Sequence, residues 1–100
     1  MNKYMLLMHE DASDPQAADD PERWRQYLAR LRSSGRFDGG SAIGSGERFR
    51  KGHPSQPSGR GLGGFIRVRA ASLQEAEGFL VGNPVFEAGG TVEVRELPQT

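Results

Sequence analysis

The sequence has 100 residues, which fits one domain with one modest core. Thirteen basic residues balance thirteen acidic ones, so the formal net charge of zero gives no overall attraction to nucleic acid or to an anionic membrane. The chain has no cysteine and only two histidines, which excludes disulfides and thiolate catalysis, and we expect no metal and no cofactor.

The first segment, MNKYMLLMHE, has an apolar run too short for a secretory signal or a membrane-spanning helix. We therefore expect a cytoplasmic protein with no membrane partner. Residues 2–9 are predicted to form a strand. Apolar side chains alternate onto both of its faces, which predicts a central strand covered on both sides. One set is Tyr4, Leu6 and Met8, and the other is Met5, Leu7 and His9.

The first helix is predicted after an acidic loop over residues 10–19. Asp20 is a suitable N-cap, Pro21 fits the first helical position, and Gly35 is a natural stop. Arg30 and Arg32 suit the last turn, where cations complement the helix dipole. One apolar stripe runs along the helix with the spacing i, i+3, i+4, i+7. Its members are Trp24, Tyr27, Leu28 and Leu31.

The second strand is expected over residues 36–43 and is weakened by its two glycines. Residues 44–61 are rich in Gly, Ser and Pro, which predicts a long mobile loop. This loop carries cations that are interpreted as solvated, with phosphate binding as the alternative. They are Arg48, Arg50, Lys51, His53 and Arg60.

The second half repeats the pattern of strand, helix and strand. The third strand spans residues 62–69, and Ser72 with Glu75 forms a capping box for a second helix. Gly82 ends that helix, and the Asn-Pro pair at 83–84 prevents its continuation. Its buried face is predicted to hold Leu73, Ala76, Phe79 and Leu80. The last strand is TVEVREL, residues 91–97.

The order βαββαβ predicts an α+β fold of the ferredoxin-like type, with an antiparallel four-stranded sheet and two helices on one face. The residues expected beneath the helices are Ile66, Val68, Val92 and Val94. The opposite face carries Phe65, Arg67, Arg69, Thr91, Glu93 and Arg95. Because the first strand is apolar on both sides, we expect a second copy to cover that face and form a homodimer.

Three segments resemble the YCII-related family, also called DGPF-domain proteins. They are KYMLLMHED at 3–11, LRSSGRFDGG at 31–40 and the stretch at 63–97 that ends in GGTVEVREL. The resemblance implies a single YCII-like domain over residues 1–100 and a dimeric α+β barrel. Most members have no established activity, and a few resemble lyase-type enzymes acting on chlorinated hydroxyquinols.

The chain departs from this family at the positions proposed for catalysis. In one branch a helix-1 histidine and an aspartate before the late proline are the proposed active pair. Here Trp24 and Asn83 stand at those positions, and neither can transfer a proton as a histidine or carboxylate does. The D-G-P-F sequence is also missing. We therefore carry over no catalytic residue from the resemblance.

Five residues are candidates for a ligand pocket, each with a structural alternative. They are His9, Trp24, Arg67, Glu93 and Arg95. A small molecule of anionic or phenolic character would fit the polar set, and a salt-bridge network or a solvated face is the alternative. Trp24 is expected in the core, or in a pocket wall where it stacks on a planar ligand. The cluster at 9–11 is read as an exposed strand end, with a metal or general-base role as the alternative.

Three functions remain open at the level of sequence. The first is a small-molecule-binding homodimer without catalysis. The second is a lyase or isomerase acting on a phenolic or hydroxy-acid substrate, with His9 or Glu93 as base. The third is RNA binding, because RGLGGFIRV at 60–68 resembles an RNA-recognition motif. Leu62 replaces an aromatic there and the net charge is zero, so we expect no nucleic-acid partner.

Overall fold

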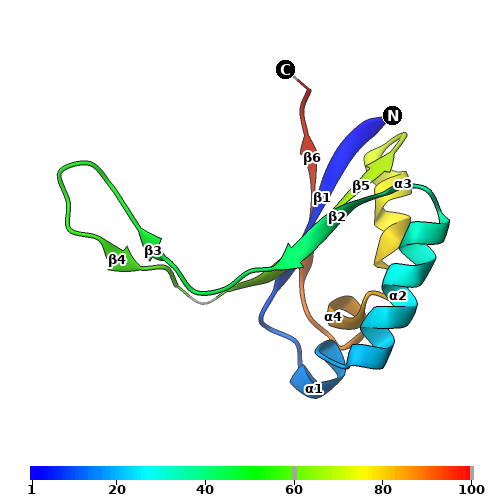
Figure 1. Ribbon diagram of the computed structural model, residues 1–100, viewed down its shortest axis with the longest axis horizontal. Helices are drawn as coiled ribbons and strands as arrows, with labels where there is room; N and C mark the ends of the chain where they lie inside the picture. The colour runs from blue at the N-terminus through cyan, green and yellow to red at the C-terminus, as the bar shows by residue number, and fades with distance from the viewer. Residues whose placement is uncertain (60, 100) are drawn as a thin grey trace.

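The computed structural model describes residues 1–59 and 61–99, and its main sheet has four antiparallel strands in the order β2-β5-β1-β6 (Figure 1). The strands are β1 (Asn2–His9), β2 (Phe37–Ala42), β5 (Leu62–Ala70) and β6 (Val92–Leu97). The two principal helical segments are α2 (Pro21–Ser33) and α3 (Leu73–Glu77), the latter continued by the 3₁₀ turn η1 (Gly78–Leu80). This order confirms the predicted ferredoxin-like α+β fold.

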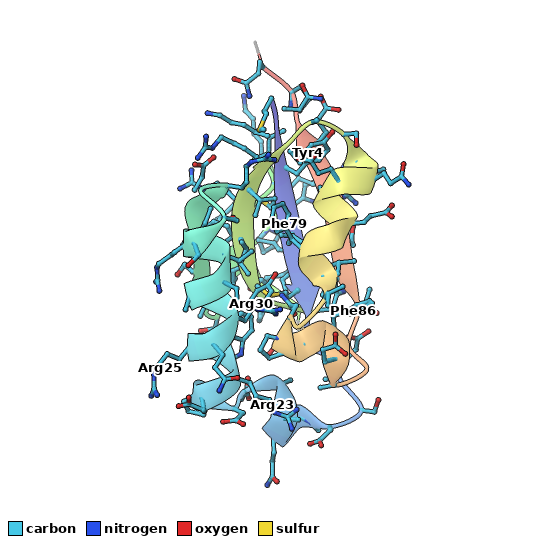
Figure 2. The ribbon with its side chains drawn as sticks, turned by 90° about the vertical axis from the view of Figure 1, so that its right-hand side faces the viewer. Tyr4, Arg23, Arg25, Arg30, Phe79 and Phe86 are labelled. Carbon is cyan, nitrogen blue, oxygen red and sulfur yellow. The ribbon has the colours of Figure 1, made fainter. Side chains whose placement is uncertain are left out.

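Both helical segments cover the same face of the sheet, side by side (Figures 1 and 2). They are joined across that layer by the Tyr27 hydroxyl, which donates a hydrogen bond of 2.6 Å to the Phe79 carbonyl. Burial of the phenol raises the pKa of Tyr27 above its ordinary value. No helix in the described part of the chain is long and apolar enough to span a membrane.

The core is built on β1, which lies between β5 and β6 as predicted for a central strand. Leu6 is fully buried and stands opposite Ile66 on one side and Val94 on the other. Tyr4 and Met8 are buried on the same face. Full burial of a leucine contributes about 2 kcal/mol relative to exposure, so this row fixes which face of the sheet receives the helices.

Helix α2 begins and ends where the sequence predicts. The Asp20 side chain accepts a hydrogen bond from the Glu22 amide, and Gly35 adopts the left-handed conformation with φ of 73°. Tyr27 and Leu31 are buried in the core. The other two members of the apolar stripe, Trp24 and Leu28, are only half-buried.

The second helix is shorter than predicted. Regular helix ends at Glu77, and the chain tightens into η1 from Gly78, a poor helix former. Leu73 is 49% exposed, so the expected buried face begins only at Ala76. The capping role of Ser72 is confirmed, because its side chain accepts from the Glu75 amide.

Two short helices lie where the sequence predicted none. Helix α1 (Pro15–Ala18) interrupts the expected acidic loop, with Asp14 as its N-cap. Helix α4 (Pro84–Glu87) follows η1, and its N-cap Asn83 accepts from the amides of Val85 and Phe86. Both begin with a cap residue followed by proline, the same signal that starts α2. The second pair, Asn83 and Pro84, was predicted only to stop the preceding helix.

The segment predicted as a long mobile loop over 44–61 contains a short antiparallel ladder. Short strands β3 (Glu47–Arg48) and β4 (Gln56–Pro57) pair antiparallel, and Ser58 and Gly46 exchange hydrogen bonds just below them. Together these residues form a hairpin that projects from the body (Figure 1), and residues 43–59 are here called the arm. Arg60, one of the cations predicted in this segment, lies outside the described residues.

Candidate functional site

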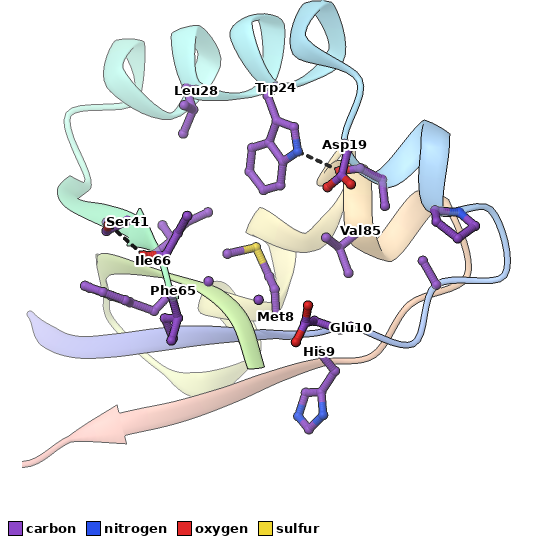
Figure 3. Close-up of a pocket in the computed structure, with 18 of the residues that line it drawn as sticks. Met8, His9, Glu10, Asp19, Trp24, Leu28, Ser41, Phe65, Ile66 and Val85 are labelled. Atoms are coloured by element: carbon purple, nitrogen blue, oxygen red, sulfur yellow. Dashed lines mark hydrogen bonds between the residues drawn. The ribbon is translucent and has the colours of Figure 1, made fainter. Parts of the chain in front are cut away.

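A cavity of about 650 Å³ lies between α2 and the helix-covered face of the sheet (Figure 3). Apolar side chains from five different elements form its wall. They are Met8, Trp24, Leu28, Phe37, Ile66 and Val85. The cavity exists because α2 packs its Tyr27 and Leu31 against the core while Trp24 and Leu28 stand over open space.

Glycines form part of the sheet surface beneath α2. Gly40 of β2 stands opposite Ile66 and Gly64 of β5 stands opposite Ala42, and both glycines line the cavity. A Cβ at Gly40 would lie 2.3 Å from the Phe65 carbonyl oxygen, so no other residue fits there. A Cβ at Gly64 would lie 3.1 Å from Met8 Cε. At both positions bare backbone therefore lines the cavity, in strands that approach their neighbours closely.

The Trp24 indole is held in one orientation. Its Nε1 donates a hydrogen bond of 2.7 Å to the Ala18 carbonyl, and its ring meets Tyr27 edge-on at 5.9 Å. Figure 3 shows the ring projecting from α2 into the cavity. With its polar atom satisfied by α1, the indole offers the cavity a flat apolar surface.

Two carboxylates and one guanidinium supply polar groups at the cavity. Glu10 follows β1, Asp19 follows α1, and Arg32 lies in the last turn of α2 with its guanidinium 5.7 Å from the centre of the Phe37 ring. Within residues 1–59 and 61–99, neither Glu10 nor Asp19 forms a salt bridge. Ionised carboxylates accept hydrogen bonds, so this edge suits a ligand that carries hydroxyl groups.

Of the five predicted pocket residues, Trp24 lines this cavity and the others project from the opposite face. His9 borders the cavity, but Figure 3 shows its ring pointing away from it. The His9 Nε2 lies 2.6 Å from Glu93 Oε1, and Arg95 Nε donates to Glu93 Oε2 at 2.9 Å. The hydrogen bond from Arg95, and then that from His9, lowers the pKa of Glu93.

Arg67 does not join that cluster. Its guanidinium donates to the Asp38 backbone carbonyl at 2.9 Å, while the Asp38 carboxylate pairs with Arg69 at 3.0 Å. Glu93 and Arg95 form an ion pair, as the salt-bridge alternative predicted, without Arg67. The open face therefore carries a cluster of three residues on β1 and β6, and a separate one on β2 and β5.

Asn83, at the position of the family's aspartate, serves the fold and is not a lining residue of the cavity. Its side chain is fully buried, caps α4, and donates from Nδ2 to Met8 Sδ at 3.6 Å. Asp11 is likewise structural. It accepts from the Thr91 hydroxyl and amide, which lowers its pKa. Within the described chain, no three His, Asp or Glu residues lie close enough together to hold a metal ion.

Asp19, Arg32 and the glycine surface were not predicted as parts of a site, and Glu10 was considered only within the cluster at 9–11, where an exposed strand end was preferred to a metal or general-base role. Glu10 follows His9 directly and so could have been placed on the opposite face by strand alternation. The register irregularity between Met8 and His9 opposite Gly64 and Leu62 obscures that alternation. Asp19 carries no comparable signal, since α1 was read as loop.

The fold and this cavity define a small ferredoxin-like α+β protein with a Trp-walled internal site. No protein-family model matches the sequence, and no curated protein matches it. Among solved structures, the chain is similar to 5-chloro-2-hydroxyhydroquinone dehydrochlorinase (TftG) from Burkholderia phenoliruptrix, solved in complex with 2,5-dihydroxybenzoquinone. The TM-score is 0.61 at 16% sequence identity, over 98% of this chain and 95% of the other. At this identity the likeness establishes the fold.

Proposed function

We propose that this protein is a YCII-type homodimer that binds a small, planar, hydroxylated aromatic molecule in the cavity beneath α2, and that it acts in the cytoplasm. The observation that carries this proposal is the cavity of about 650 Å³ with the Trp24 ring in its wall. Small-molecule sites have volumes of roughly 300–1,000 Å³ and mostly apolar walls with a few polar groups, which describes this cavity.

The polar groups favour a neutral phenol over an anion. Phenolic hydroxyls donate hydrogen bonds, and Glu10 and Asp19 can only accept them when ionised. An anionic ligand would meet like charge from both carboxylates, against one cation at Arg32. The ring of such a ligand can stack on Trp24, where an offset aromatic pair contributes about 1 kcal/mol beyond its buried area.

The structural comparison supports the same ligand class. The similar dehydrochlorinase is named for a chlorinated hydroxyhydroquinone and was solved with a dihydroxybenzoquinone. Both are small planar rings with several oxygen substituents. The likeness of folds makes this class the natural first probe for the present cavity.

The open face of the sheet supports the homodimer. Met5 and Leu7 of β1 are half-buried, with Met5 between two arginines and Leu7 between Phe65 of β5 and Glu93 of β6. No helix of the described chain covers this face. A second copy related by a two-fold axis would bury these three side chains against their equivalents.

The second candidate function is a lyase or isomerase acting on the same ligand class. Two carboxylates beside one cavity favour it, because Glu10 could take a proton from a bound hydroxyl while Asp19 holds the ring in place. His9 and Glu93, predicted from the sequence as candidate bases, could serve only a different site, on the open face. There a carboxylate already orients the imidazole at 2.6 Å.

Calorimetric titration with hydroquinone, with benzoate as the anionic comparison, tests the binding proposal. We expect hydroquinone to bind and benzoate to bind about tenfold more weakly, as expected for one unfavourable charge contact. Glu10→Gln should weaken hydroquinone binding, whereas His9→Ala, its neighbour on the opposite face, should leave it unchanged. Loss of binding in His9→Ala with retention in Glu10→Gln would move the site to the open face and overturn the assignment.

A further inference from the structure

The arm is a long, exposed segment with little regular structure of its own. Its residues 43–59 are all exposed, and its only regular structure is the two-residue ladder of β3 and β4. A lone two-stranded hairpin is at best marginally stable in water, because each ordered residue costs about 1–2 kcal/mol of backbone entropy. A hairpin of this kind gains stability when it lies on another surface.

The end of the arm has the chemistry of a docking element. Phe49 is 80% exposed and is flanked by three cations against one nearby acid, Glu47. The cations are Arg48, Arg50 and Lys51. An aromatic side chain set among basic residues is typical of interface centres, where aromatics and arginine are enriched.

The complementary surface is the acidic rim, here defined as residues 10–22, which borders the cavity. It carries six acids and no lysine or arginine, and two of these acids, Asp20 and Glu22, pair with arginines of α2 just beyond it. The acids are Glu10, Asp11, Asp14, Asp19, Asp20 and Glu22. Ala12 and Pro15 of the rim also line the cavity, so an apolar side chain laid on the rim would lie at the cavity entrance. Although its net charge is zero, the chain therefore has two regions of opposite charge, the basic arm and the acidic rim.

The far end of the arm, with β3 and β4, lies away from the rim of its own chain, although Ile43 at its base lines the same cavity as Glu10. Figure 1 shows the arm extending to one side of the body while α1 lies on the other side of the sheet's lower end. The molecule is 46 Å long in this direction, and the arm accounts for the projecting part. Contact between the basic arm and the acidic rim therefore requires a second molecule.

We propose that the arm of one copy docks across the acidic rim of a second copy, with Phe49 at the cavity entrance and the arm cations paired with the rim carboxylates. In a two-fold dimer the exchange is reciprocal, so each cavity is closed by the partner's arm. This inference rests on the proposed homodimer and adds that each binding site is completed in trans. It also gives the arm the partner that its exposed phenylalanine requires.

Cysteine cross-linking tests the contact cleanly, because the natural chain contains no cysteine. Two single variants are mixed and oxidised mildly: Ser55→Cys on the arm, which leaves Phe49 in place, and Gln16→Cys on the rim, one of them carrying a mass tag. Gln74→Cys, another exposed helical glutamine on α3, replaces Gln16→Cys in the control mixture. We expect about tenfold more mixed disulfide with the rim than with the control, because docking raises the effective concentration of the two thiols.

Added salt supplies a second readout, since exposed charge pairs are screened within about 10 Å at 0.1 M ionic strength. The mixed disulfide should decrease with salt and with Arg50→Glu in the arm. Equal yields with rim and control, or a rim yield indifferent to both changes, would overturn the docking.

Sedimentation and hydroquinone titration of the unmodified chain separate this result from the proposed function. A dimer that binds hydroquinone but shows no preferential cross-link refutes the docking alone. A monomer without binding refutes the homodimer and the site, and the docking with them.

Discussion

The two faces of the main sheet bury the apolar side chains of β1 in different ways. On one face, Leu6 and its neighbours lie beneath helices, and the incomplete fit of α2 leaves a Trp-walled cavity. On the other, Leu7 lies among ion pairs that involve Glu93 and Arg95, with no helix of the described chain above it. The helix-covered face thus encloses a cavity, whereas the open face leaves Leu7 half-buried beside ion pairs, and we propose a ligand site on the first face and an interface on the second.

The largest effect should come from truncating adjacent leucines on the two faces. Leu6→Ala removes a side chain with no exposure and should cost about 3 kcal/mol of unfolding free energy. Leu7→Ala should cost the chain itself about 1 kcal/mol, because this side chain is only half-buried. Urea unfolding measures both. A cost for Leu7→Ala that rises with protein concentration would show burial by a second copy, and equal costs independent of concentration would contradict the contrast between the faces.

A smaller loss of unfolding free energy is expected on substitution of Asn83, the buried N-cap of α4. Asn83→Ala leaves the amides of Val85 and Phe86 without their acceptor in a buried place and should cost about 2 kcal/mol. Asn83→Ser keeps an oxygen acceptor and should cost less. Thermal unfolding ranks the variants. If alanine and serine cost the same, the cap is not what stabilises α4.

The smallest effect concerns acid pH, and it involves Glu93 on the open face and Glu75 on the helical side. The pKa of Glu93 is lowered by Arg95 and His9, and that of Glu75 by Arg36 and the Ala71 amide. Because both folded-state pKa values lie below the ordinary value of 4.5, the stabilisation is present above that pH and is lost as pH falls through the lowered values. Unfolding temperature should therefore decrease below about pH 4.5.

The matched variants sharpen this prediction. Glu93→Gln should reduce the decrease of unfolding temperature at acid pH. Glu75→Gln, on the helical side, should do the same. High salt should reduce both contributions, since the carboxylates are exposed. A profile unchanged in either variant would show that the corresponding ion pair does not stabilise the folded state.

Much of the fold follows from short-range pattern. Alternation in residues 62–69 and in the last strand fixed which side chains lie beneath the helices, and the cap at Asp20 placed the start of α2. Helices α1 and α4 escaped prediction because four residues are too few for an apolar periodicity. The β3–β4 ladder escaped because its glycine- and proline-rich sequence has no strand pattern.

The site was less predictable, for a geometric reason. A helical stripe shows that Trp24 and Tyr27 face inward, but not that Tyr27 reaches the core while Trp24 stops over a cavity. That distinction depends on how α2 crosses the sheet and on missing side chains at Gly40 and Gly64. The candidates on the open face were recognisable from alternation alone, because the sheet sets their direction directly.

The most direct test of the central claim uses Trp24, the one tryptophan in the sequence, as an intrinsic reporter of the cavity. Titration of the protein with hydroquinone, followed by tryptophan fluorescence, should give a change that saturates and that requires more ligand in Glu10→Gln. Free N-acetyltryptophanamide should instead show only a proportional, unsaturating loss of emission. If the protein behaves like the free indole, the cavity beneath α2 does not bind this class of ligand.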